Sequence, residues 1–129
     1  MRLLFLLILT SCLPAKTIRV ATYNVSLAQT GQGQLAALLR TGTHVPAKKI
    51  AEVIQIVQPD VLLLNEFDYD ANGTAATRMN DKFFNVSQNG RPAQDYPYRY
   101  VAISNTGVHS GFDFDNNGTI DDSPGDISY

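Results

Sequence analysis

The chain has 129 residues, 44% of them hydrophobic, and its 10 basic and 12 acidic side chains leave a formal charge of -2 at pH 7. This balance excludes a broad basic face for wrapping duplex nucleic acid, so no strong nucleic-acid-binding surface is expected. Cys12 is the only cysteine, which excludes an intrachain disulfide. Stability must therefore come from packing or from bound ions.

The N-terminus has the pattern of a secretory signal peptide over residues 1–15. Its apolar run is much shorter than the roughly 20 residues that cross a bilayer, so no transmembrane helix is expected. Leu9 to Cys12 fits a bacterial lipobox, with Cys12 as the site of a lipid anchor; cleavage after Ala15 and a buried segment over residues 3–13 are the alternatives. The pattern predicts an exported protein, which is periplasmic, an outer-membrane lipoprotein or secreted.

Residues 16–129 form the domain that follows, and its first predicted element is a strand. Residues 18–25 alternate apolar and polar side chains and are rich in β-branched residues, which favours a strand with Asn24 near its C-terminal end. A loop containing Gly and Gln follows, and a short helix is predicted over Leu35 to Arg40.

An amphipathic helix is predicted between Pro46 and Pro59, because Pro suits a first helical turn and ends a helix when it follows one. Its apolar residues recur at three- and four-residue spacing, namely Ile50, Val53, Ile54 and Val57. The continuous apolar run over residues 61–64 then predicts a buried strand that ends at Asn65 and Glu66.

Strand, helix and strand in this order predict an α/β layer with a crossover connection. Asn24 and Glu66 would both lie at strand C-termini, where ligands often bind in open α/β sheets. Farther along, a short helix is predicted over Ala75 to Phe84 and another strand over Tyr98 to Ile103. The last residues, rich in Gly, Asp and Asn, are predicted to be loop.

Three segments resemble, in order and spacing, the start of the endonuclease/exonuclease/phosphatase superfamily, namely Thr22–Val25, Lys49–Ile54 and Gln58–Asp68. Later segments are similar to a secreted bacterial branch of it, namely Tyr96–Tyr98, Asn105–Val108 and Ser110–Asp115. The resemblance covers most of the chain after the signal peptide. It implies the N-terminal portion of a four-layer α/β/β/α sandwich and the activity of a metal-dependent phosphoesterase.

The resemblance also implies that Asn24 and Glu66 serve a metal site. A carboxylate suits Mg²⁺ or Mn²⁺, which needs one or two such ligands together with water and substrate phosphate. The Asn amide can donate to a phosphate oxygen or position a water without adding negative charge. By local pattern alone, the favoured interpretation is a turn residue at Asn24 and a solvated charge at Glu66; the resemblance reverses this preference.

Segments that the superfamily carries farther along, an Asp with a nearby Asn and a terminal Ser-Asp-His, are not recognisable in this sequence. His44 and His109 are the only histidines, and neither follows an Asp. The expectation is therefore a truncated fragment that is inactive alone, exposes apolar faces and tends to aggregate. Its substrate would be a phosphate ester whose identity the sequence leaves open.

A second constellation lies in the tail and resembles an EF-hand calcium loop. Oxygen-bearing side chains occupy its positions 1, 3, 5 and 9, namely Asp113, Asp115, Asn117 and Asp121. Pro124 replaces the acidic ligand at position 12. A solvated turn is the competing interpretation, and a non-catalytic exported calcium-binding module, with Ca²⁺ in a structural role, is the alternative function.

Overall fold

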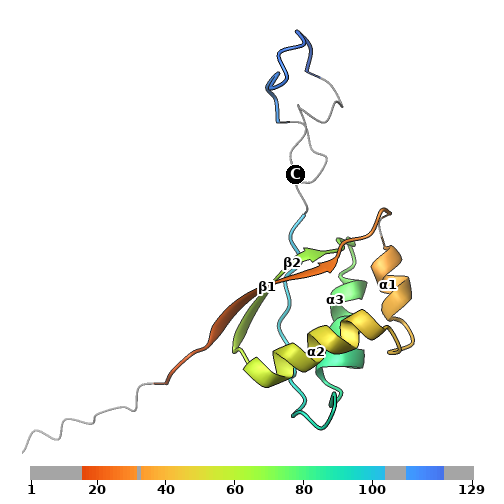
Figure 1. Cartoon of the computed structure of the whole chain (residues 1–129), viewed down its shortest axis with the longest axis vertical. Coiled ribbons are helices and arrows are strands. Elements are labelled where there is room, and N and C mark those ends of the chain that lie inside the picture. The colour runs from red at the N-terminus through yellow and green to blue at the C-terminus, as the bar shows by residue number, and fades with distance from the viewer. Residues whose placement is uncertain (1–15, 32, 104–109, 121–129) are drawn as a thin grey trace, which may run out of the picture.

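The computed structural model describes residues 16–31, 33–103 and 110–120. The predicted signal peptide and Cys12 lie outside the described residues. The elements in chain order are β1 (Val20–Leu27), α1 (Gln34–Leu39), α2 (Val45–Val57), β2 (Val61–Phe67), α3 (Thr74–Met79) and a π-helix, η1 (Asn80–Phe84). β1 and β2 pair in parallel, and the helices lie against one side of this sheet (Figure 1). The described part is a small mixed α/β structure.

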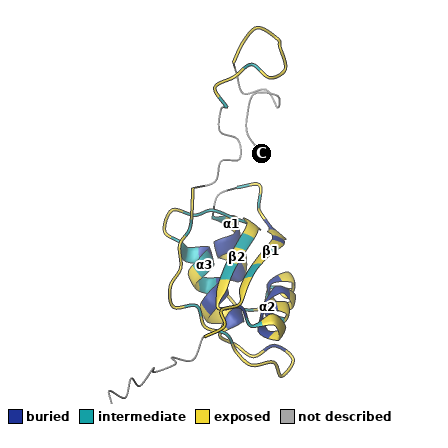
Figure 2. Cartoon of the chain, turned by 90° about the vertical axis from the view of Figure 1, so that its left-hand side faces the viewer, coloured by how far each residue is buried: buried dark blue, intermediate teal, exposed yellow. Residues whose placement is uncertain are grey.

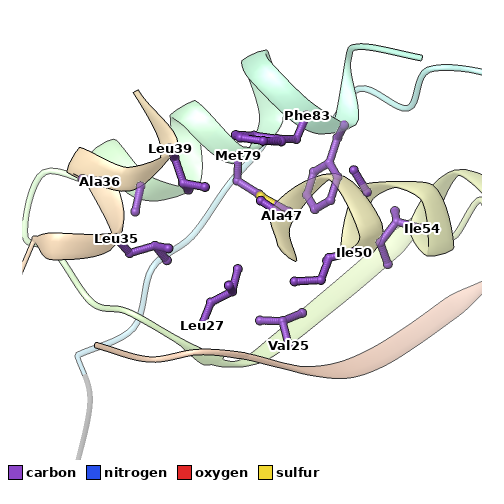
Figure 3. Packing of buried hydrophobic residues seen from close by; sticks show 13 residues of the cluster. Val25, Leu27, Leu35, Ala36, Leu39, Ala47, Ile50, Ile54, Met79 and Phe83 are labelled. Carbon is purple, nitrogen blue, oxygen red and sulfur yellow. The ribbon is translucent and has the colours of Figure 1, made fainter. Parts of the chain in front are cut away.

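The core lies between the sheet and the helices. Val25 and Leu27 point from β1 toward the helices, which contribute residues from α1, α2, α3 and η1 (Figure 3). The most deeply buried large side chains include Leu35, Leu39, Ile54, Met79 and Phe83. Of the four residues that predict the apolar face of α2, Ile50 and Ile54 are buried, whereas Val53 and Val57 are 41% and 39% exposed. The spacing therefore predicts the helix but only half of the face that it buries.

α2 confirms the predicted amphipathic helix, and its end is defined by polar contacts. Gln58 adopts a left-handed conformation with φ 50° and donates its N–H to Ile54 O at 2.7 Å, which caps the helix before Pro59. The Arg19 guanidinium donates to Val57 O, and the Arg19 N–H donates to Asp60 Oδ2 at 2.8 Å. These contacts join the start of β1 to the end of α2.

The prediction that the apolar run of β2 is buried is wrong for half of its side chains. Val61 and Leu63 are 53% and 60% exposed, and Val20, which pairs with Val61, is 70% exposed. The helices cover only one face of the sheet, so exposed residues alternate with buried or partly buried ones along β1, and along β2 as far as Asn65 (Figure 2). The expected exposure of an apolar face is thus present in the described structure.

The predicted helix over Ala75 to Phe84 is confirmed, but its second half is a π-helix. Its characteristic bond joins Asn85 N–H to Asn80 O at 2.8 Å. Gln55, buried on α2, donates through Nε2 to Phe84 O and to Val86 O, each at 2.8 Å. This side chain satisfies carbonyl groups that the end of the helix leaves without helical partners.

The predicted strand over Tyr98 to Ile103 is not formed. The segment is extended but pairs with neither strand in the part of the chain that the structure describes, and Tyr98 is 94% exposed. Val101 instead lies beside the start of α3, where a Cβ on Gly73 would be 3.6 Å from Val101 Cγ2. Alternating aromatic and β-branched residues therefore give an extended chain without a sheet partner.

Candidate functional site

Asn24 and Glu66 come together at the C-terminal ends of the two parallel strands. Residues 24 and 65 are register partners, so Glu66 follows the residue directly opposite Asn24. Asn24 Nδ2 donates a hydrogen bond of 2.6 Å to Glu66 Oε1, across 42 residues of sequence. The two predicted site residues are thus in direct contact on the exposed face of the sheet.

Glu66 reaches this face because the backbone departs from a regular strand. Asn65 is exposed, whereas Phe67 packs against the core, although residues two apart in a regular strand share a face. Glu66 has φ 53°, and opposite it the register shifts between Asn24 and Leu27. Left-handed conformation costs a non-glycine residue about 1–3 kcal/mol, and such strain persists where the surrounding structure over-determines it.

The orientation of the Asn24 amide is fixed by a second hydrogen bond. Ser26 N–H donates to Asn24 Oδ1 at 3.0 Å, so the amide presents Nδ2 to the carboxylate. Because the acceptor is charged, the Asn24–Glu66 bond is of the stronger, charge-assisted kind. One N–H of Nδ2 and the second oxygen of Glu66 have no hydrogen-bond partner among the described residues, and both side chains are exposed.

Asn24 and Glu66 carry oxygen atoms of the type that bind divalent cations. Glu66 offers a free carboxylate oxygen, and Mg²⁺ accepts a site with one or two carboxylates when water and phosphate complete its coordination. Among residues 16–31, 33–103 and 110–120, no group of three or more His, Cys, Asp or Glu side chains could hold a metal ion. Among the described residues, at most one further side chain of these types therefore lies close enough to Glu66 to share an ion with it.

Two acidic residues that follow β2, Asp68 and Asp70, accept backbone hydrogen bonds at the starts of helices. Asp68 Oδ2 accepts the Leu35 N–H at 3.2 Å at the start of α1. Asp70 accepts the Thr74 and Ala75 N–H groups at 2.7 and 2.8 Å at the start of α3. Asp preceding a helical segment by a few residues is the signal that could have identified the second contact.

The pKa of Asp70 reflects this capping. Partial burial alone would raise it, but the backbone N–H groups of Ala75 and Thr74 stabilise the carboxylate and hold the pKa below its usual value. Asp70 therefore carries a charge that the helix start stabilises. This carboxylate contributes to the fold and lies outside the Asn24–Glu66 contact.

The tail loop brings together three of its four predicted calcium ligands. Asp113 Oδ1 and Asp115 Oδ1 both accept the Asn117 N–H at 3.1 Å, and Asp113 Oδ2 accepts the Gly118 N–H at 2.9 Å. Asp121, the fourth predicted ligand, lies outside the described residues. These bonds have the geometry of turns closed by Asp side chains, and they involve the same oxygens that a calcium ion would bind.

No protein-family model matches the chain, and neither a curated protein nor a solved structure matches it. No helix in the described ranges is long and apolar enough to cross a membrane.

Proposed function

We propose that the chain is the N-terminal part of an exported metal-dependent phosphoesterase. The observation that carries this proposal is the contact between Asn24 and Glu66 at the carboxyl ends of adjacent parallel strands. Two polar residues 42 positions apart meet where open α/β sheets commonly bind ligands. The left-handed backbone at Glu66 supports the same interpretation, because strained conformations cluster at functional sites.

The proposal assigns different roles to the two side chains. Glu66 would bind Mg²⁺ or Mn²⁺ through its free carboxylate oxygen, and Asn24 would hold the other oxygen in place with one N–H. The second N–H of Asn24 remains able to donate to a phosphate oxygen of the substrate. A bound ion at this position would neutralise the charge that develops on the phosphoryl oxygens.

The proposed architecture is the first portion of a four-layer α/β/β/α sandwich. The apolar residues on the exposed face of β1 and β2, including Val20, Val61 and Leu63, support it, because a second sheet packed on that face would remove them from water. The general base would come from outside the segment described. The 129-residue chain alone is therefore expected to show no phosphodiesterase activity.

Metal binding tests the proposal without requiring turnover. We expect the 129-residue chain to bind Mn²⁺ at this site. The free ion can be measured by electron paramagnetic resonance during a titration. Glu66→Gln should weaken it roughly tenfold or more, since even the outer partners of metal ligands are worth that much. Glu52→Gln is the matched control, because Glu52 is the only other glutamate in the chain. Equal affinity for Mn²⁺ in Glu66→Gln and the wild type would reject the proposal.

The alternative function is a calcium-binding module, and the convergence of Asp113, Asp115 and Asn117 is the observation that favours it. It predicts Ca²⁺ affinity that Asp113→Ala removes and Glu66→Gln leaves unchanged. The phosphoesterase proposal predicts the opposite dependence for Mn²⁺. Titration of both ions against both variants therefore separates the two functions.

A further inference from the structure

Ser26 lies two residues beyond Asn24 on β1 and has an unusual backbone for a residue with a side chain. Its φ is 49°, in the left-handed region that favours glycine. Its side chain is exposed, and its hydroxyl makes no hydrogen bond within the described ranges. The fold thus holds a strained residue whose side chain contributes no polar contact.

The Ser26 N–H, in contrast, makes a contact that bears on the site. It donates to Asn24 Oδ1 at 3.0 Å, which closes an Asx-type turn between residues 24 and 26. With Oδ1 engaged in this way, Nδ2 is the group that faces Glu66 Oε1 at 2.6 Å. The orientation of the Asn24 amide therefore depends on where the backbone of Ser26 directs its N–H.

We propose that Ser26 is a positioning residue, whose left-handed backbone and N–H orient Asn24 and, through it, the Glu66 carboxylate. The register supports this role: between the Asn24–Asn65 and Leu27–Phe67 pairs, β1 contains two residues and β2 contains one. This is the arrangement of a β-bulge, and bulges commonly re-aim side chains next to active sites. The inference rests on the proposed function of Asn24 and Glu66, which it deepens.

The proposal separates the backbone of Ser26 from its hydroxyl. Ser26→Ala keeps the N–H and removes only the oxygen, so the site should be unchanged. Ser26→Gly lowers the cost of the left-handed conformation, so it should retain or strengthen the orientation. Ser26→Val adds a β-branched side chain, for which positive φ is strongly disfavoured, so it should turn the N–H away from Asn24.

The first measurement uses the metal-free protein. In ¹H–¹⁵N spectra, the side-chain NH₂ of Asn24 should show a downfield proton and slow solvent exchange, because one N–H is bound to a carboxylate. Ser26→Ala and Ser26→Gly should preserve both signatures, and Ser26→Val should lose them while the amide signals of the core residues stay in place. Should Ser26→Val fail to fold, Ser26→Thr provides a smaller β-branched substitution at the same position.

The second measurement is the affinity for Mn²⁺ in the same variants. Ser26→Val should weaken Mn²⁺ binding roughly 10-fold or more, as loss of a residue that positions a metal ligand does. Ser26→Gly should bind Mn²⁺ as tightly as the wild type or more tightly. If the folded Val or Thr variant keeps the Asn24 signature and the affinity, Ser26 has no positioning role. Absence of Mn²⁺ binding in the wild type would overturn the proposed function, and the metal-free spectra would still decide whether Ser26 orients Asn24.

Discussion

Gln55 offers the strongest test of how the helices are held together. It is 1% exposed on α2 and bridges to the segment after α3. Its Nε2 donates to Phe84 O and Val86 O, each at 2.8 Å, and its Oε1 accepts the Gln88 N–H at 2.9 Å. Gln55→Leu keeps the approximate volume and removes these three bonds together with the longer one from Nε2 to Phe83 O at 3.4 Å.

The cost follows from which partners are left without a hydrogen bond. Phe84 O keeps the Gln94 N–H at 2.8 Å, and Val86 O keeps Gln88 Nε2 at 3.0 Å. The Gln88 N–H alone has no substitute partner among the described residues. One buried donor left without a partner, together with the lost bonds from Gln55 Nε2, should lower the free energy of unfolding by about 2–4 kcal/mol.

Urea denaturation followed by circular dichroism measures this free energy. The melting temperature should also fall by at least about 8 °C, since each kcal/mol is worth about 4–8 °C in a domain of this size. Gln88→Ala is the comparison, because Phe83 O and Val86 O, which accept from Gln88 Nε2, keep Gln55 Nε2 as a partner. This substitution should cost only about 1 kcal/mol. A Gln55→Leu variant within about 0.5 kcal/mol of the wild type, or a larger cost for Gln88→Ala, would refute this account.

Two further predictions concern the dependence of stability on pH. The pKa of Asp70 is lowered, so its contribution to the free energy of unfolding is present above pH ~4 and is lost as the pH falls through the lowered value. Asp70→Asn replaces one of the two oxygens that accept the Thr74 and Ala75 N–H groups with an NH₂ group, so it should cost about 1 kcal/mol at pH ~7 and flatten the acid side of the stability profile. Burial raises the pKa of Tyr96 to about 12. Its contribution to the free energy of unfolding is therefore complete below pH ~10 and is lost as the pH rises from there toward the raised pKa. Tyr96→Phe removes the hydroxyl that donates to Pro59 O at 2.9 Å, which should cost about 1 kcal/mol at neutral pH and reduce the alkaline loss. Urea unfolding at a series of pH values checks both, and an unchanged profile in either variant contradicts its prediction.

The elements that the sequence predicts correctly are those whose signals are local. Pro46, the apolar spacing and Pro59 define α2, because a helix start, an amphipathic face and a helix end can each be recognised within a few residues. Asn24 and Glu66 could likewise be placed at strand ends. Their contact then follows from the parallel pairing, which a single crossover between two strands requires.

The errors arise where the neighbours of a segment decide its structure. The continuous apolar run of β2 is typical of a strand covered on both faces, but the helices of the described structure cover one face, so Leu63 is 60% exposed. Tyr98 and Val101 belong to a pattern that favours a strand, yet Val101 lies beside Gly73. Composition and alternation do not show which partner a segment will have.

The left-handed residues of the site escape prediction for a different reason. Ser and Glu carry no local preference for positive φ, unlike Gly or Asn, so nothing in the sequence around Ser26 or Glu66 indicates the bulge. The conformation is imposed by the residues on either side. Val25 and Leu27 are 6% and 3% exposed in the core, and Phe67 packs against the same cluster.

These anchors explain how the strained conformation can persist on an exposed surface. Returning Ser26 or Glu66 to a regular strand would shift Leu27 or Phe67 out of register and expose apolar surface. Fully burying one such side chain is worth about 1.5–3 kcal/mol, which is comparable to the cost of one left-handed residue, about 1–3 kcal/mol. The core beneath the sheet and the Asn24–Glu66 contact above it are therefore coupled, so truncation of Leu27 should disturb a site that its side chain does not touch.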